Sequence, residues 1–212
     1  MLSYVREDAT ATMIGWLARL RSMLPQPDVP ARAEEHTVRG LPVVVQNTRP
    51  DIETQTVLRR LDEALGMINM YQPWRLAHMR RDLSAILIAR YPCRGAFFPE
   101  HRVCLTELTF LARTDITAAP VAASILHEGM HARVHAKCAR DEARDRAREE
   151  RICRRAEYEF GVALPTALGA PVVERAAASL QLEDEDVAPV IDWAEAQRRQ
   201  DVVDAEARGR TL

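Results

Sequence analysis

The spacing of apolar residues along the chain is mostly helical, and it becomes strand-like in the first half. Apolar positions that recur every three or four residues predict helices over residues 3–24, 51–70, 73–82, 117–137, 139–160, 171–182 and 187–208. Short β-branched or apolar runs predict strands over residues 41–46, 84–90, 94–98 and 102–110. This order of elements predicts an α+β fold that is mostly helical, with one small sheet.

Breaks in the periodicity divide the chain into three predicted parts. Residues 1–40 are expected to form an N-terminal helix and a proline-containing linker, and residues 41–165 contain all the predicted strands. Residues 166–212 are predicted to be C-terminal packing helices. Gly161 and Pro165 are expected to end the helix that precedes this last part.

Composition and charge narrow the classes of protein that the chain can represent. With 29 Lys+Arg against 31 Asp+Glu, the net charge of −2 argues against a dedicated nucleic-acid-binding protein. No window approaches ~18 uninterrupted apolar residues, so we expect no stable membrane insertion. The first residues lack the order of a signal peptide, and the four cysteines form no CxxC pair. These features predict a cytoplasmic protein with reduced thiols.

One predicted helix contains residues with the spacing of a metal site. His127 and His131 in the sequence HEGMH lie four residues apart, so both imidazoles project from the same face of the helix. Two such rings can reach one tetrahedral ion at roughly 2.0–2.1 Å each. Glu128 follows the first histidine and can reach a water on that ion, where a carboxylate serves as general base. The pattern predicts a Zn²⁺ site in which the metal activates a water for attack on a carbonyl group.

This helix, together with the strand predicted before it, resembles the zincin metallopeptidases. The resemblance implies a small sheet packed on the HExxH helix, with a peptide bond of a protein or peptide as the substrate of the zinc-activated water. It also implies that the strand over residues 103–110 is an edge strand that pairs with an extended substrate. The chain reads HEGMHARVHAKC, which departs from the metzincin continuation HExxHxxGxxH.

A later segment is similar to the glutamate helix of the gluzincin subgroup. It reads EERICRRAE over residues 149–157. This similarity implies that Glu150 is the third zinc ligand, and Glu149 and Glu157 are the alternatives. Arg154 stands where many gluzincins have aspartate, four residues after Glu150, so the similarity does not settle which glutamate binds.

The proposed ligand set requires the chain to turn back between its histidines and its glutamates. A straight helix would separate residues 131 and 150 by roughly 28 Å. The turn is therefore expected in the polar stretch 138–145, where Asp141 or Asp145 could cap the second helix.

Several further residues remain open as members of the site. His135 cannot bind the same ion as His127, because eight helical residues span about 12 Å. Cys138 and Cys153 are less favoured thiolate ligands, since cysteines are commonly just buried. Candidates for stabilising the oxyanion are Tyr158, Arg154 and His101.

Two other functions are compatible with the same residues. One is hydrolysis of a different amide by the same zinc chemistry. The other is a non-catalytic regulatory or partner-binding protein that keeps a zincin-like fold. Only turnover separates these readings, because Glu128 is compatible with all of them.

Overall fold

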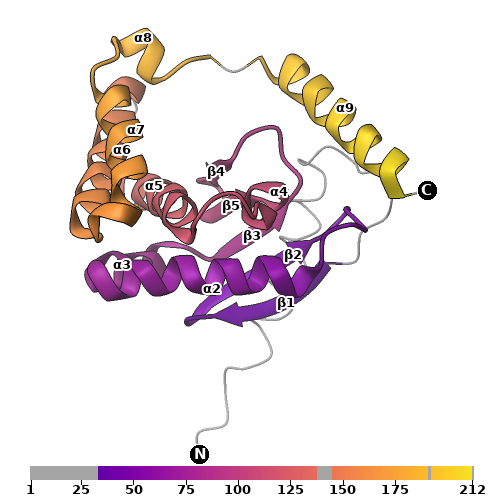
Figure 1. The fold of residues 1–212 in the computed structure, drawn as a ribbon. Helices are drawn as coiled ribbons and strands as arrows, with labels where there is room; N and C mark the ends of the chain where they lie inside the picture. Colours follow the sequence, from indigo (N-terminus) through magenta and orange to yellow (C-terminus); the bar gives the residue numbers. More distant parts are fainter. Residues whose placement is uncertain (1–32, 138–144, 191, 212) are drawn as a thin grey trace, which may run out of the picture.

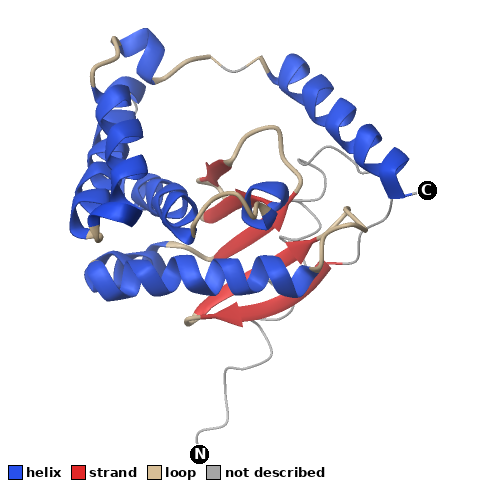
Figure 2. Cartoon of the chain, viewed as in Figure 1, coloured by secondary structure: helices blue, strands red, loops and turns tan. Residues whose placement is uncertain are grey.

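The computed structural model describes residues 33–137, 145–190 and 192–211. Within these ranges helices predominate, and they surround one five-stranded mixed sheet (Figures 1 and 2). The α+β prediction is therefore confirmed. The helix predicted over residues 3–24 lies outside the described residues.

The sheet consists of three parallel strands between two antiparallel edges. Its order is β1-β2-β3-β5-β4. The inner strands β2, β3 and β5 run parallel, and the edge strands β1 and β4 are antiparallel to their neighbours. The bounds are β1 (Ala33–Val38), β2 (Leu41–Gln46), β3 (Ala85–Ala89), β4 (Gly95–Phe98) and β5 (Val103–Glu107).

Strand β1 falls in the segment that the sequence analysis took for a linker. It pairs with β2 through a two-residue turn in which Arg39 and Gly40 both have positive φ, 47° and 77°. Such turns match the twist of a hairpin, and glycine adopts this backbone at little cost. The prediction was wrong because Glu34 and Glu35 are exposed and break the apolar signal, as charges on edge strands commonly do.

Eight helices complete the described part of the chain. They are α2 (Thr54–Tyr71), α3 (Pro73–Asp82), α4 (Leu108–Ala112), α5 (Ala118–Lys137), α6 (Arg146–Ala163), α7 (Thr166–Leu180), α8 (Asp184–Val187) and α9 (Trp193–Thr211). Helices α2, α3 and α5 lie along one face of the sheet, and α6 and α7 stand side by side at one end of α5 (Figure 1). The main core lies between this sheet face and these helices. It places α5 directly beneath strands β4 and β5.

The strand predicted over residues 102–110 is shorter than expected, and it is not an edge. Strand β5 ends at Glu107, whose side chain accepts a hydrogen bond from the Phe110 N–H and caps α4. β5 is paired on both sides, with β3 and with β4. The edge strand next to α5 is therefore β4.

The C-terminal helices also differ from the predicted bounds. Gly161 lies inside α6, where a Cβ atom would come within 2.9 Å of Val173; glycine here permits close packing of α6 and α7 and does not end the helix. Helix α7 begins at Thr166 and continues through Pro171. The helix predicted over residues 187–208 is interrupted near Pro189, so α8 ends at Val187 and α9 begins at Trp193.

The described helices were also searched for a membrane span. None of them is both long enough and apolar enough to cross a bilayer.

Candidate metal centre

The predicted reversal between the histidines and the glutamates is confirmed. Helix α5 ends at Lys137 and α6 begins at Arg146. Asp145 caps α6 by accepting a hydrogen bond from the backbone N–H of Arg148. Helix α6 then packs back along α5, which brings the glutamate segment opposite the two histidines.

Three side chains from these two helices converge on one point. The Nε2 atoms of His127 and His131 are 3.1 Å apart. One carboxylate oxygen of Glu150 lies 3.3 Å from His127 Nε2, and the other lies 3.3 Å from His131 Nε2. The carboxylate thus faces both imidazoles at once.

These distances fit a tetrahedral ion. Donor atoms about 2.0–2.1 Å from a zinc ion, at the corners of a tetrahedron, are about 3.3–3.4 Å apart. The separation of the two nitrogens, and that of each nitrogen from the Glu150 oxygen that faces it, are within a few tenths of an ångström of that value. Two imidazole nitrogens and one carboxylate also form a donor set that zinc prefers, and a fourth position is left for other chemistry.

Each of the other two glutamates named from the sequence contacts one imidazole, at the Nδ1 atom on the side away from Nε2. Glu157 Oε1 lies 2.6 Å from His127 Nδ1, and Glu149 Oε1 lies 2.9 Å from His131 Nδ1. A carboxylate on the Nδ1 side fixes the ring and leaves Nε2 for a metal. The structure therefore separates the three glutamates: Glu150 faces the Nε2 atoms, and Glu149 and Glu157 hold the rings.

Cys153 is a second candidate for the third ligand position. Donor atoms of His127, His131 and Cys153 all lie within 4.8 Å of one another. The thiol is fully buried, and burial raises its pKa although the hydrogen bond with His131 lowers it. Glu150 is the better fit, because its oxygens lie at 3.3 Å from the Nε2 atoms and its carboxylate is already charged. Cys138 lies outside the described residues.

Glu128 lies beside these donors and is nine-tenths buried. Burial raises the pKa of its carboxyl group, the two imidazoles lower it, and the net direction is upward. A Cβ atom at Gly95 would come within 2.9 Å of Glu128 Oε1, so strand β4 passes directly over the carboxylate. Only a residue without a side chain leaves room for Glu128 in this position.

The contacts around the two imidazoles favour their protonated forms. Burial by itself lowers the pKa of both histidines, but hydrogen bonds outweigh it and the pKa of each is raised. For His127 these hydrogen bonds are with Glu150 and Glu157. For His131 they are with Cys153, Glu149 and Glu150. The same contacts hold the pKa of Glu150 well below its usual range, although burial opposes this. These contacts therefore favour a proton on the imidazole pair beyond the one that each neutral ring carries.

Zinc binding is expected to release that proton. A metal needs both Nε2 atoms unprotonated, so the affinity should rise with pH, by about tenfold per unit for each proton released, until the raised pKa is passed. Calorimetric titration with zinc in two buffers of different ionisation enthalpy measures the number of protons. Equal heats in both buffers, or affinity that falls as pH rises, would contradict the proposed ligands.

A cavity of about 430 Å³ opens over His127, His131 and Glu150, the candidate metal ligands, and we call it the metal-site cavity. Strand β4 borders it with Gly95, Ala96 and Phe97, and α6 borders it on the opposite side. The expectation that the strand over residues 103–110 is the edge that pairs with a substrate was wrong, since β5 is an inner strand. The edge that borders the cavity belongs to β4.

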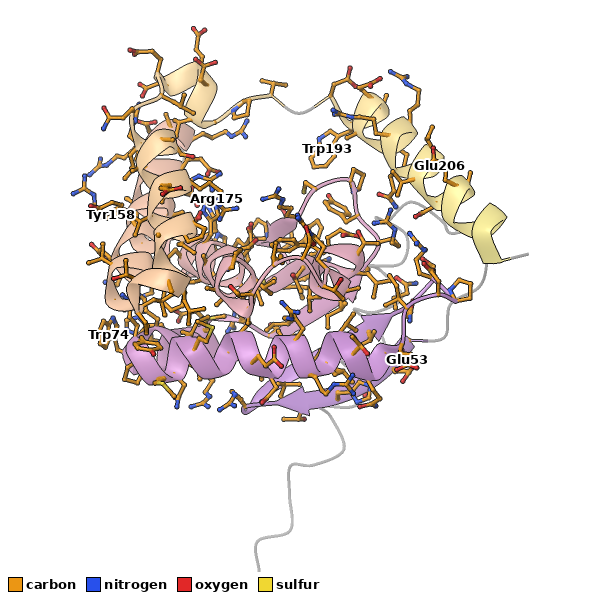
Figure 3. All side chains as sticks on the ribbon, in the orientation of Figure 1. Glu53, Trp74, Tyr158, Arg175, Trp193 and Glu206 are labelled. Carbon is orange, nitrogen blue, oxygen red and sulfur yellow. The ribbon has the colours of Figure 1, made fainter. Side chains whose placement is uncertain are left out.

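The three oxyanion candidates lie in different places. Arg154 lines the metal-site cavity. Tyr158 is 37% exposed and lies on the outer side of the α6–α7 pair (Figure 3). His101 lies in the turn between β4 and β5, where its backbone N–H donates a hydrogen bond to the Phe98 carbonyl. It is not among the residues that line this cavity. His135 packs its ring against Phe97, with the ring centroids 5.9 Å apart.

Three residues near the site were missed by reasoning from the sequence. They are Gly95, Arg94 and Arg175. Gly95 and Arg94 come from a predicted strand that carries no motif, and Arg175 comes from a helix that was assigned only a packing role. Their positions depend on the tertiary fold, and no local spacing in the sequence indicates them.

Comparison with models of protein families, with curated proteins and with solved structures finds no match to this chain.

Proposed function

We propose that the chain is a zinc-dependent peptidase of the zincin type, which hydrolyses a peptide bond in a protein or peptide. The observation that carries the proposal is the convergence of His127, His131 and Glu150 at 3.1–3.3 Å, with a buried carboxylate beside them. A metal hydrolase needs this combination of an open three-ligand site and an adjacent base.

Each histidine ligand in this proposal has a glutamate partner that holds its ring in place. His127, His131 and Glu150 would hold the zinc ion. Glu157 and Glu149 keep the Nδ1 atoms protonated and the rings oriented. When bound, zinc lowers the pKa of a coordinated water and polarises the carbonyl group of the substrate.

Glu128 is the proposed general base. Its carboxylate adjoins the ligands and accepts a proton at Oε1 or Oε2, which it can then pass to the leaving amine. The charge of Arg154, at the wall of the metal-site cavity, favours the negative charge that develops on the carbonyl oxygen. Among the three oxyanion candidates, Arg154 is therefore the one we assign.

Strand β4 is the proposed binding site for the substrate backbone. Among the described strands it pairs with β5 alone, and its residues Gly95, Ala96 and Phe97 border the metal-site cavity. An extended peptide that adds to this edge would lie across the ligands, with backbone hydrogen bonds independent of its side chains. This arrangement favours a peptide over a small amide as the substrate.

We extend the proposal to a cytoplasmic location. Cys93, Cys104 and Cys153 are free thiols. A reducing compartment keeps cysteines in this state.

A non-catalytic role is the second candidate, and Cys153 is the observation that favours it. If its thiolate joined the two histidines and Glu150, the metal would have four protein ligands. Such closed sites are structural and leave no position for a substrate.

The proposed activity is tested by exposing the zinc-loaded chain to a mixture of synthetic peptides and reading new termini by mass spectrometry. We expect cleavage that a zinc chelator stops and added zinc restores. No new terminus in any peptide, from protein with one zinc per chain, would contradict the peptidase proposal.

A substitution at Gly95 tests how closely the base is positioned. In Gly95→Ala the new methyl group would collide with the Glu128 carboxylate, so hydrolysis should fall by about ten- to a hundredfold while zinc binding is unchanged. Gly66→Ala is a matched control, because its Cβ would also meet a side chain at 2.9 Å, but that side chain is Arg39, on the β1–β2 turn. Equal losses in both variants would indicate a general packing effect and would refute the special role of Gly95.

A further inference from the structure

A second cavity adjoins the metal ligands, and it is rich in arginine. It has a volume of about 370 Å³ and lies between the start of β4, helix α5 and the α6–α7 pair. We call it the arginine cavity. The residues that line it include three arginines, two glutamates and one of the proposed histidine ligands: Arg94, Arg154, Arg175, Glu128, Glu157 and His127. Whatever occupies this cavity lies next to the proposed reaction centre.

Two of the arginines share a single carboxylate. Glu157 is fully buried, and it accepts hydrogen bonds from Arg154 at 2.7 Å and from Arg175 at 2.6 Å. The same carboxylate also contacts His127. The Nε atom of Arg154 is buried, with no hydrogen-bond partner among the described residues. The single carboxylate of Glu157 thus contacts two guanidinium groups and an imidazole.

The third arginine has no acidic partner in the part of the chain that the structure describes. Arg94 lies over the ring of Phe110, with its Cζ atom 5.4 Å from the ring centroid. Burial, followed by the positive charges of Arg175 and Arg113, lowers its pKa. The stacking holds the guanidinium group at the cavity without neutralising it.

The cavity therefore carries more positive than negative charge. Three guanidinium groups face two carboxylates, those of Glu128 and Glu157. Arg175 lies on the side of the α6–α7 pair that faces the centre of the molecule, as Figure 3 shows. The planar guanidinium group binds carboxylates through paired N–H donors, and an excess of positive charge favours anionic groups over neutral and cationic ones.

We propose that the arginine cavity binds a carboxylate of the peptide substrate, so that cleavage occurs beside an acidic side chain or beside a C-terminal carboxylate. The proposal rests on the peptidase function proposed above and names its substrate class. Arg94 and Arg175 are the specificity-determining residues. Arg175 can bind the substrate with the guanidinium N–H groups that do not contact Glu157, and Arg94 can do so with its whole guanidinium group.

The test measures binding separately from hydrolysis. Synthetic octapeptides of alanine, blocked at both ends, carry glutamate, glutamine or lysine at the centre, and a fourth peptide has glutamine at the centre and a free C-terminal carboxylate. Each is titrated calorimetrically into zinc-loaded protein with the substitution Glu128→Gln, which is expected to bind the peptides without cleaving them. We expect the glutamate peptide, the peptide with the free carboxylate, or both to bind at least about tenfold more tightly than the blocked glutamine peptide. Which of the two binds identifies the source of the carboxylate.

Variants in the same background show whether the arginines are the cause. In the double variant Arg94→Gln/Arg175→Gln, the affinities for the acidic peptide and the blocked glutamine peptide should differ by no more than about twofold. Arg94→Gln alone should lower the ratio of these affinities measurably, and it leaves the hydrogen bonds of Glu157 in place. Arg113→Gln is the matched control, because this arginine pairs with Asp115 and does not line the cavity, so the ratio should stay high.

The proposal is overturned if the blocked glutamate and glutamine peptides and the peptide with the free carboxylate bind equally, if no peptide binds, or if the preference persists in the double variant. A clear acidic preference without cleavage of any peptide by the parent protein would leave the cavity assignment standing. That outcome would refute the peptidase function instead.

Discussion

Replacing Glu128 with glutamine is expected to reduce peptide hydrolysis by about 10²–10⁴-fold and to leave zinc binding intact. Glutamine keeps the size of the side chain and fits beneath Gly95, but it cannot accept the proton. Glu128 lies beside the three proposed ligand residues and is not one of them, so the metal should stay. Kinetics on a cleaved peptide and zinc stoichiometry, measured on the same preparation, check both halves of this expectation.

Glu100→Gln is a matched control for this variant. Glu100 is exposed in the turn after β4, so its loss should leave both activity and zinc content unchanged. If Glu128→Gln hydrolysed peptides like the parent protein, another group would have to serve as the base. If it lost zinc instead, Glu128 would be part of the metal site and the roles of the residues would need to be reassigned.

Replacing Glu150 with alanine is expected to weaken zinc binding itself. The variant keeps only two histidines at the site, and two ligands do not fix the open tetrahedral geometry that catalysis requires. The loss of affinity should exceed the ~10–100-fold that is typical of removing an outer partner of a ligand. Hydrolysis should fall with zinc occupancy. Competition with a coloured chelator measures the affinity.

The neighbouring variants separate the ligand from its partners. Glu149→Ala removes a residue that contacts Nδ1 of His131 and leaves the proposed ligands in place. The zinc affinity of this variant should therefore fall by no more than ~10–100-fold. Cys153→Ser should bind zinc nearly as the parent protein does. If Glu150→Ala binds zinc normally while Cys153→Ser loses it, the third ligand is the thiolate, and the non-catalytic alternative gains its main support.

The fold could be predicted from the sequence wherever local periodicity determined an element. Helix α3 begins at Pro73 as expected, because proline suits the first turn, and the apolar run 84–90 contains β3. Two of the errors share one cause, which is that tertiary contacts decided the outcome. Strand β1 needs its pairing with β2 to be recognised, and Gly161 continues a helix because α7 packs against it.

The site divides in the same way. The spacing of His127 and His131 predicts that both imidazoles share one helix face, and the structure places both residues on α5 with their Nε2 atoms 3.1 Å apart. The glutamates of α6 were identified as a group, but their separate roles follow from how α6 packs on α5, which the sequence does not encode locally. The edge strand was misassigned for a comparable reason. The order of strands in the sheet places β4 outside β5, although β4 comes first along the chain.

The assignment of His127, His131 and Glu150 as zinc ligands is tested most directly by anomalous diffraction at the zinc edge from crystals of the zinc-loaded chain. We predict one peak per chain, at roughly 2.0–2.1 Å from Nε2 of both His127 and His131 and at about 2.0–2.2 Å from a carboxylate oxygen of Glu150. Absence of a peak at these atoms would contradict the proposed site. A peak with Sγ of Cys153 at about 2.3 Å would contradict the open three-ligand site, whether the thiolate replaces Glu150 or closes the tetrahedron as a fourth ligand.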